Sequence, residues 1–136
     1  MTAKRPLLFD SHALLKYFQK ERGHEKIARL LDQSRRTGAR RLISAINLGE
    51  IICSVKRTFG DQKKVEVMAH MERLGFTILP VPNSIIFQAA EFKAEYSISF
   101  ADCFALASAL EEGASIVTGD PEFRKVEKLA HIVWID

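Results

Sequence analysis

Residues 115–122 read Ser-Ile-Val-Thr-Gly-Asp-Pro-Glu, a short apolar run that leads into a turn, an aspartate and a proline. Asp120 fits the N-cap of a helix, because its carboxylate can accept hydrogen bonds from the backbone N–H groups that a first helical turn leaves unpaired. Pro121 fits the next position, where no backbone donor is needed. The stretch therefore predicts a strand that ends just before an aspartate and continues into a helix.

Strand and helix patterns alternate in the same way through the rest of the chain. Apolar runs predict strands at residues 6–10, 42–44, 76–81, 115–118 and 132–135. Apolar residues at helical spacing predict helices that begin near Ser11 and cover about 24–34, 48–59, 63–74, 83–95 and 101–112, with a short helix after Asp120. Asn83 is the expected cap of one of these helices, and Gly60 the expected end of another. The alternation predicts an α/β fold, a single three-layer domain over residues 1–136 with a largely parallel central sheet flanked by helices.

The composition is that of an ordinary globular domain, with 47% hydrophobic and 27% charged residues among 136. No apolar run is long enough to cross a bilayer, and the first residues lack a signal-peptide core, so we expect a cytoplasmic protein with no membrane partner. The net charge of +3 is compatible with a polyanionic partner but does not establish one. Cys53 and Cys103 show no C-x-x-C spacing, and we expect them to be small core residues rather than disulfide or zinc cysteines.

Four carboxylates occupy positions that one end of such a sheet would bring together. Asp10 and Asp120 end strands, while Glu50 and Asp102 lie in or near the first turns of helices entered from the same end. Each has a simpler explanation, since the first two fit N-caps, Asp102 fits a capping box with Ser99, and Glu50 fits an exposed surface. Four independent caps or surface acids would need no common location, however, whereas a shared site would.

Asp102 is the hardest of these acids to explain by capping alone. Ala105, Leu106 and Ala109 follow it at i+3, i+4 and i+7, so its side chain emerges from an apolar face of the helix, where a carboxylate is costly unless compensated. Acids a few ångströms apart also raise one another's pKa, so a cluster predicts a bound cation. Ligation by oxygen alone favours Mg²⁺ or Mn²⁺ over zinc.

Four stretches resemble, in order and spacing, the acidic motifs of PIN-domain ribonucleases, and most closely those of the VapC-type toxins of toxin–antitoxin pairs. They are Phe-Asp-Ser-His-Ala-Leu-Leu (9–15), Ile-Ser-Ala-Ile-Asn-Leu-Gly-Glu-Ile (43–51), Ile-Ser-Phe-Ala-Asp-Cys-Phe-Ala-Leu-Ala-Ser-Ala-Leu (98–110) and Ile-Val-Thr-Gly-Asp-Pro-Glu-Phe (116–123). The resemblance extends from Leu7 to the last strand. It implies a PIN-like fold and an endoribonuclease that hydrolyses RNA phosphodiester bonds with a water activated by Mg²⁺ or Mn²⁺.

The resemblance also assigns residues and partners. It implies that Asp10, Glu50, Asp102 and Asp120 are the catalytic, metal-binding acids and that Thr118 contributes a hydroxyl. Ser11 and, more loosely, Asn47 match polar positions beside the first and second acids, Glu122 is a weaker fifth carboxylate, and His12 is not expected to bind metal. It further implies a homodimer that is inhibited by a small antitoxin protein.

Two basic groups are candidates for contacts with RNA phosphates, although such clusters are usually plain solvated surface. The first comprises Arg35, Arg36, Arg40 and Arg41, and the second comprises Lys56, Arg57, Lys63 and Lys64.

Two other functions remain open. One is a catalytically inactive PIN-like module that binds RNA or protein. The other is an aspartate-dependent phosphatase with Asp10 as the nucleophile, although such enzymes usually need a second acid where His12 stands.

Overall fold

A five-stranded, all-parallel sheet lies at the centre of the protein in a computed structural model that describes residues 4–136. The strands are β1 (Leu7–Phe9), β2 (Arg41–Ser44), β3 (Phe76–Leu79), β4 (Ser115–Thr118) and β5 (Ile132–Trp134). Their order across the sheet is β3-β2-β1-β4-β5. In this register Leu8 is paired with Leu42 on one side and with Ile116 on the other. The predicted α/β class with a parallel sheet is confirmed.

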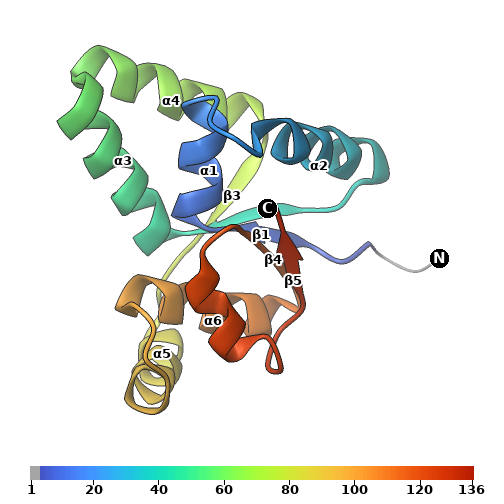
Figure 1. Ribbon diagram of the computed structural model, residues 1–136, viewed down its shortest axis with the longest axis vertical. Coiled ribbons are helices and arrows are strands. Elements are labelled where there is room, and N and C mark those ends of the chain that lie inside the picture. Colours follow the sequence, from blue (N-terminus) through green and yellow to red (C-terminus); the bar gives the residue numbers. More distant parts are fainter. Residues whose placement is uncertain (1–3) are drawn as a thin grey trace.

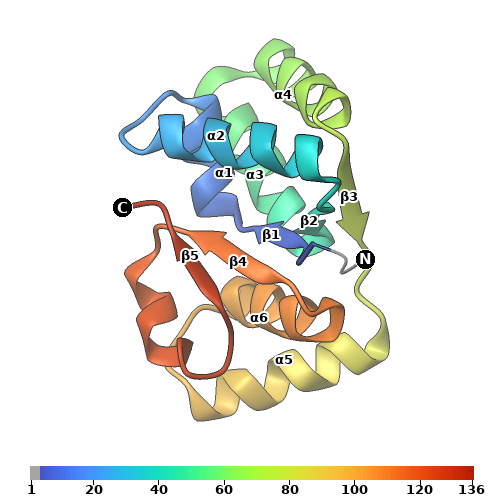
Figure 2. The same ribbon diagram turned by 90° about the vertical axis from the view of Figure 1, so that its right-hand side faces the viewer.

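Helices cover both faces of the sheet and complete three layers (Figures 1 and 2). The helices α1 (Ser11–Phe18), α2 (His24–Thr37), α3 (Ala45–Phe59) and α4 (Asp61–Arg73) lie on one face, and α5 (Asn83–Glu95) and α6 (Phe100–Glu112) lie on the other. A 3₁₀ helix, η1 (Pro121–Val126), follows β4. No helix within residues 4–136 is both long enough and apolar enough to span a membrane.

Each strand contributes side chains to two separate cores, because successive residues of a strand point to opposite faces. Leu8 belongs to the core beneath α5 and α6, and its neighbour Phe9 belongs to the core beneath α1 to α4. Ile116 and Val117 of β4 divide in the same way. Burial on both faces explains why these strands read as continuous apolar runs rather than as alternating patterns.

Several local predictions need correction. Asn83 is the first residue of α5 rather than its cap, because Pro82 occupies the N-cap and makes no side-chain capping bond. Cys103 is buried as expected, but Cys53 is exposed, since it lies off the buried face of α3. The third strand ends at Leu79, directly before Pro80, which lacks the backbone donor that a strand uses. Gly60 ends α3 as predicted.

The order of the strands determines where a ligand site can form. The chain moves from β1 to β2 and β3 on one side, and β4 and β5 are added on the other side of β1. The sheet therefore has a topological switch point between β1 and β4, and in parallel α/β sheets the crevice beyond the carboxyl ends of such strands is the usual ligand site. Asp10 and Asp120 follow these two strands.

Candidate metal centre

Asp10 is buried at the carboxyl end of β1, with 1% of its surface exposed. Its backbone N–H donates to the carbonyl of Val117 at 3.3 Å, which continues the pairing of β1 with β4. One carboxylate oxygen, Oδ1, accepts a hydrogen bond from the N–H of Ala13 at 2.8 Å and caps α1. The other, Oδ2, accepts from the hydroxyl of Thr118. Asp10 is therefore both the predicted cap and part of a contact between two strands.

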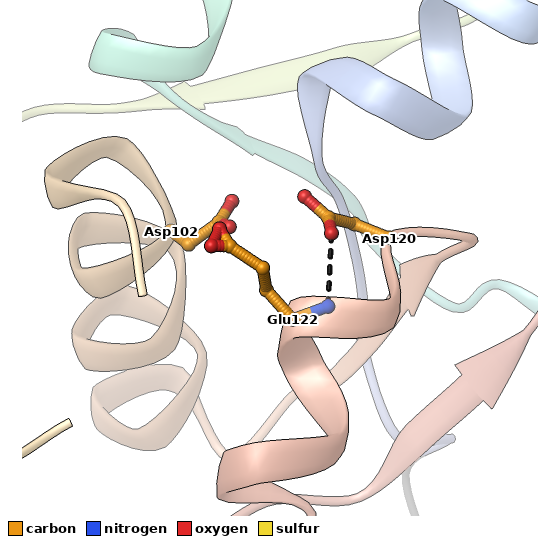
Figure 3. A group of neighbouring side chains, drawn as sticks. All are labelled: Asp102, Asp120 and Glu122. Atoms are coloured by element: carbon orange, nitrogen blue, oxygen red, sulfur yellow. Dashed lines mark hydrogen bonds between the residues drawn. The ribbon is translucent and has the colours of Figure 1, made fainter. Parts of the chain in front are cut away.

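Thr118 links the two strand ends through its hydroxyl. Its Oγ1 donates to Asp10 and accepts from the backbone N–H of Asp120 at 2.9 Å. Asp120 in turn caps η1, where its Oδ1 accepts from the N–H of Glu122 at 2.9 Å (Figure 3). Thr118 is fully buried, so its bond to Asp10 is shielded from water, while the two bonds made by Asp120 are partly buried. It holds the Asp120 turn beside Asp10.

Asp102 reaches the same place from α6 and is 7% exposed. The Ser99 hydroxyl caps this helix by accepting from the N–H of Asp102 at 3.1 Å. Within residues 4–136, however, the Ser99 backbone N–H donates no bond to the carboxylate, and the carboxylate Oδ2 is buried without any hydrogen-bond partner. Capping therefore explains the backbone of Asp102 but not its side chain.

Three carboxylates form a compact group at this point. One oxygen each from Asp102, Asp120 and Glu122 lies within 4.8 Å of the others, and Figure 3 shows the Asp102 and Glu122 carboxylates facing each other from α6 and η1. The sequence favours four other acids over Glu122 as metal ligands. In the structure, however, Glu122 belongs to this group, whereas Asp10 and Glu50 do not. The signal for Glu122 was its place two residues after Asp120, since the 3₁₀ turn returns its side chain toward α6.

Glu50 extends the acidic site on the side of α1 and α3. Its Oε1 accepts hydrogen bonds from the Ser11 hydroxyl at 2.8 Å and from Nδ2 of Asn47 at 3.0 Å. Ser11 directly follows Asp10, so this contact brings Glu50, an exposed residue, to the start of α1. Asn47 is fully buried, and its Oδ1 has no partner. Ser11 and Asn47, the two polar residues that match the family motifs, thus both hold Glu50.

Crowding and burial change the proton affinity of two of these acids. Burial raises the pKa of Asp10 from 3.8 to about 7, against the hydrogen bonds from Thr118 and Ala13, and the charges of Asp120 and Glu50 add to the increase. Burial likewise raises the pKa of Asp102 to about 7, with further contributions from the charges of Asp120 and Asp10. The contributing charges belong to acids that are distant in sequence but lie close to Asp10 and Asp102 in the fold.

The side chains at this site fit a hard divalent cation. All of the clustered donors are carboxylate oxygens, and the buried Oδ2 of Asp102 lacks a partner. Within residues 4–136, no Lys, Arg or His forms an ion pair with Asp10, Glu50, Asp102, Asp120 or Glu122. His12 lies beside Gly119 and is not a member of the compact group. Oxygen donors of this kind suit Mg²⁺ or Mn²⁺.

Most of the basic candidates are engaged with other parts of the protein. Arg35 and Arg36 pair with Asp32, and Arg40 pairs with Glu112. Lys56 and Lys64 pair with Asp61, Lys63 lies 3.9 Å from Glu66, and Arg57 donates to the sulfur of Cys53. Arg41 donates to the carbonyls of Ala39 and Leu74 and to the Ser34 hydroxyl, which is a structural role. For most residues of the two basic groups, these contacts favour a role as ordinary solvated surface over a role in binding RNA phosphates.

Comparison with known proteins identifies the fold. The family model described as "PIN domain" matches residues 7–129. A chain in the crystal structure of DNA-bound VapBC from Salmonella typhimurium is 16% identical, with a TM-score of 0.77 and coverage of 98% of this chain and 100% of that one. Mycobacterium tuberculosis VapC20, described as a sarcin-ricin loop cleaving toxin, is 19% identical, with a TM-score of 0.73 and coverage of 88% and 94%. A chain of FitAcB from Neisseria gonorrhoeae is 19% identical, with a TM-score of 0.70 and coverage of 95% and 97%. No significant match was found among curated proteins.

Proposed function

Because this chain belongs to the PIN-domain family, through a match over residues 7–129, we propose that it is an endoribonuclease that depends on Mg²⁺ or Mn²⁺. Asp10, Glu50, Asp102 and Asp120 are its proposed catalytic acids, and Thr118 supports them. The observation that carries the proposal is the unpartnered, buried Oδ2 of Asp102 beside two further carboxylates. A buried carboxylate oxygen without a donor is costly, and a cation would remove that cost.

The acids have two different roles in this proposal. Asp102, Asp120 and Glu122 would hold the cation directly, and Asp10 and Glu50 would complete the acidic rim of the site. A bound divalent ion supplies positive charge for the phosphate oxygens and lowers the pKa of a water that attacks phosphorus.

The hydroxyl and amide groups of the site have positioning roles. Thr118 keeps Asp10 and the Asp120 turn in contact, while Ser11 and Asn47 orient Glu50. Because the attacking group in this proposal is a water molecule, no side chain is needed as a nucleophile. In the absence of the cation, Asp10 and Asp102 take up protons near neutral pH because burial raises the pKa of each to about 7.

The same geometry does not favour a phosphatase with Asp10 as the nucleophile. Asp10 is 1% exposed, and both of its oxygens accept hydrogen bonds from Ala13 and Thr118. A nucleophilic carboxylate oxygen must reach phosphorus in line, and the burial of Asp10 leaves its oxygens no such access. We therefore propose that Asp10 supports the cation site instead.

We further propose that the protein is the toxin of a toxin–antitoxin pair, acts in the cytoplasm, forms a homodimer and binds a small antitoxin protein. The support is its similarity to a chain of a toxin–antitoxin complex from Klebsiella pneumoniae, with a TM-score of 0.70, and to VapC20, which is described as a toxin. Inducible expression in bacteria tests this role. Wild type should arrest growth and Asp102→Asn should not, at equal protein levels.

Cleavage of a single-stranded RNA tests the enzymatic proposal directly. Wild type should cut the RNA with millimolar MgCl₂ or MnCl₂ and should leave it intact in EDTA, and Asp102→Asn should lose activity by roughly a hundredfold or more, as for removal of other essential groups in a site. Asp32→Asn, an exposed aspartate on α2, is the matched control and should retain activity. RNA that stays intact under every metal condition, but is bound, would instead support a module that only binds RNA.

A further inference from the structure

A pocket of about 410 Å³ lies where the end of α1, the start of α2 and one side of α4 meet. Its lining includes three rings and three cations, Tyr17, Phe18, His70, Lys20, Lys63 and Arg73. None of these residues belongs to the acidic site. The combination of flat rings and positive charge is the feature that needs an explanation.

The three rings pack against one another in one cluster, inclined at 55–67° so that each presents its own face or edge. The ring centroids of Tyr17 and Phe18 lie 5.2 Å apart, and the ring of His70 lies 5.6 Å from Tyr17 and 5.3 Å from Phe18. The Tyr17 hydroxyl lies 3.4 Å from Nε2 of His70, which fixes the two side chains relative to each other. All three residues are half-buried, so the cluster is anchored in the fold while part of it faces solvent.

The pocket also carries excess positive charge. Lys63 lies 3.9 Å from Glu66, but Lys20 and Arg73 form no ion pair with any residue between 4 and 136. Lys20 is, moreover, the one residue other than glycine with a positive φ in that range, at 53°. This conformation follows the end of α1 and normally favours glycine, so a lysine there carries a local conformational cost.

We propose that this pocket binds a nucleotide of single-stranded RNA away from the scissile bond, with the base stacked on one ring of the Tyr17–Phe18–His70 cluster and the phosphate held by Lys20 and Arg73. This proposal rests on the proposed function, because it takes RNA to be the substrate. Stacking of bases on aromatic side chains together with phosphate–cation contacts is how proteins hold single strands without reading sequence. An acidic peptide would use the cations but would have no use for the rings.

The position of the pocket relative to the acids supports this assignment. Ser11, which contacts Glu50, and Phe18 are seven residues apart on α1 and therefore lie on the same face of that helix. At a rise of 1.5 Å per residue they are separated by about 10 Å along the helix axis. At this separation a single strand bound at the acids can also reach the pocket.

Binding of a fluorescent twelve-nucleotide single-stranded RNA in EDTA, where cleavage is prevented, tests the proposal. The double variant Lys20→Ser/Arg73→Ser should bind at least about tenfold more weakly than the control Arg29→Ser/Lys128→Ser, which removes the same charge from exposed cations elsewhere. The slope of log Kd against log salt should fall by about 0.7 in the first variant alone, the value for one single-strand phosphate. Tyr17→Leu, checked for an unchanged fold by circular dichroism, should weaken binding without changing this slope.

The outcomes separate this proposal from the proposed function. If wild type cleaves RNA with metal and the two double variants bind RNA equally, the pocket does not bind RNA and the nuclease proposal stands. If wild type neither binds nor cleaves RNA, both are overturned. If the pocket variants lose affinity for a polyglutamate peptide but not for RNA, the pocket is a site for an acidic protein, and the proposal is wrong.

Discussion

The hydroxyl of Thr118 donates a hydrogen bond to Asp10, a residue 108 positions earlier in the chain, and accepts one from the N–H of Asp120. This single buried group joins the ends of β1 and β4 at the switch point of the sheet. Thr118→Val keeps the shape of the side chain but removes both hydrogen bonds. We expect it to lower the free energy of unfolding by about 1–3 kcal/mol, because buried polar partners are left unsatisfied.

Urea unfolding of the metal-free protein measures this loss. Thr118→Ser is the control, since it keeps the hydroxyl and should recover most of the stability. A valine variant as stable as wild type would show that the Asp10–Thr118 contact contributes little to the fold.

The stability of the metal-free protein should depend on pH through Asp10 and Asp102. Burial raises the pKa of each from 3.8 to about 7, so the folded state binds more protons than the unfolded state between these values. The resulting stabilisation is fully present below the unfolded pKa and is lost as the pH rises through about 7. Asp102→Asn, which cannot ionise, should therefore gain melting temperature relative to wild type in EDTA as the pH is raised from 5 to 8.

Melting curves of both proteins across this pH range give the difference directly, and groups that titrate in both proteins, such as His70, cancel. Asp102 is the better position for this test than Asp10, because both oxygens of Asp10 already accept hydrogen bonds and an amide would lose one of them. A difference that does not change with pH would contradict the raised pKa of Asp102.

Added Mg²⁺ or Mn²⁺ should stabilise the wild-type protein. A ligand present at a hundred times its Kd contributes about 2.7 kcal/mol to the folded state, which corresponds to roughly 5–10 °C in melting temperature for a domain of this size. Differential scanning fluorimetry with and without metal measures the response, with CaCl₂ at equal ionic strength as a comparison. An unchanged melting temperature at millimolar Mg²⁺ and Mn²⁺ would count against a cation site.

The contribution of Glu122 can be separated from that of Glu50. Glu122 shares the compact group with Asp102 and Asp120, whereas Glu50 contacts Ser11 and Asn47 outside it. Glu122→Gln should therefore reduce the metal-induced rise in melting temperature more than Glu50→Gln does. Glu127→Gln, an exposed glutamate just after η1, is the control and should respond as wild type. The opposite order for Glu122 and Glu50 would place the cation nearer α3.

Gly119 is predicted to be essential for the shape of the turn between Thr118 and Asp120. A Cβ at this position would lie 2.8 Å from Oδ2 of Asp136, 2.9 Å from Cγ1 of Ile135 and 3.1 Å from Cε1 of His12. Gly119→Ala should cost about 1–3 kcal/mol of stability through overpacking and should also lower RNA cleavage, because the turn carries Asp120.

Gly49→Ala is the matched control for this variant. A Cβ there meets no atom within 4 Å, and the residue lies inside α3. Alanine should stabilise this helix by about 0.5–1 kcal/mol. If Gly119→Ala proved equally harmless in thermal melting, the close packing around the turn would not constrain the site.

Much of the local structure could be predicted from short stretches. Asp10, Ser99 and Asp120 cap helices as their sequence contexts indicate, because capping depends on contacts within two or three residues. The caps and the acidic site proved not to be alternatives, since Asp10 and Asp120 serve the fold while also facing the other acids. The environment of Cys53 could not be predicted, because apolar neighbours along a helix do not specify which of its sides meets the core.

The sequence by itself determined the order of strands and helices along the chain, the parallel arrangement of the sheet and the list of candidate acids. These follow from periodicity and from interactions between near neighbours. Only the tertiary structure decided which acids share a group. The packing of Phe123 and Val126 of η1 into the same core as Leu106 of α6 brings Glu122 to Asp102, while Glu50 is held by α1 instead. That outcome depends on contacts between segments far apart in the chain, whose geometry local patterns do not contain.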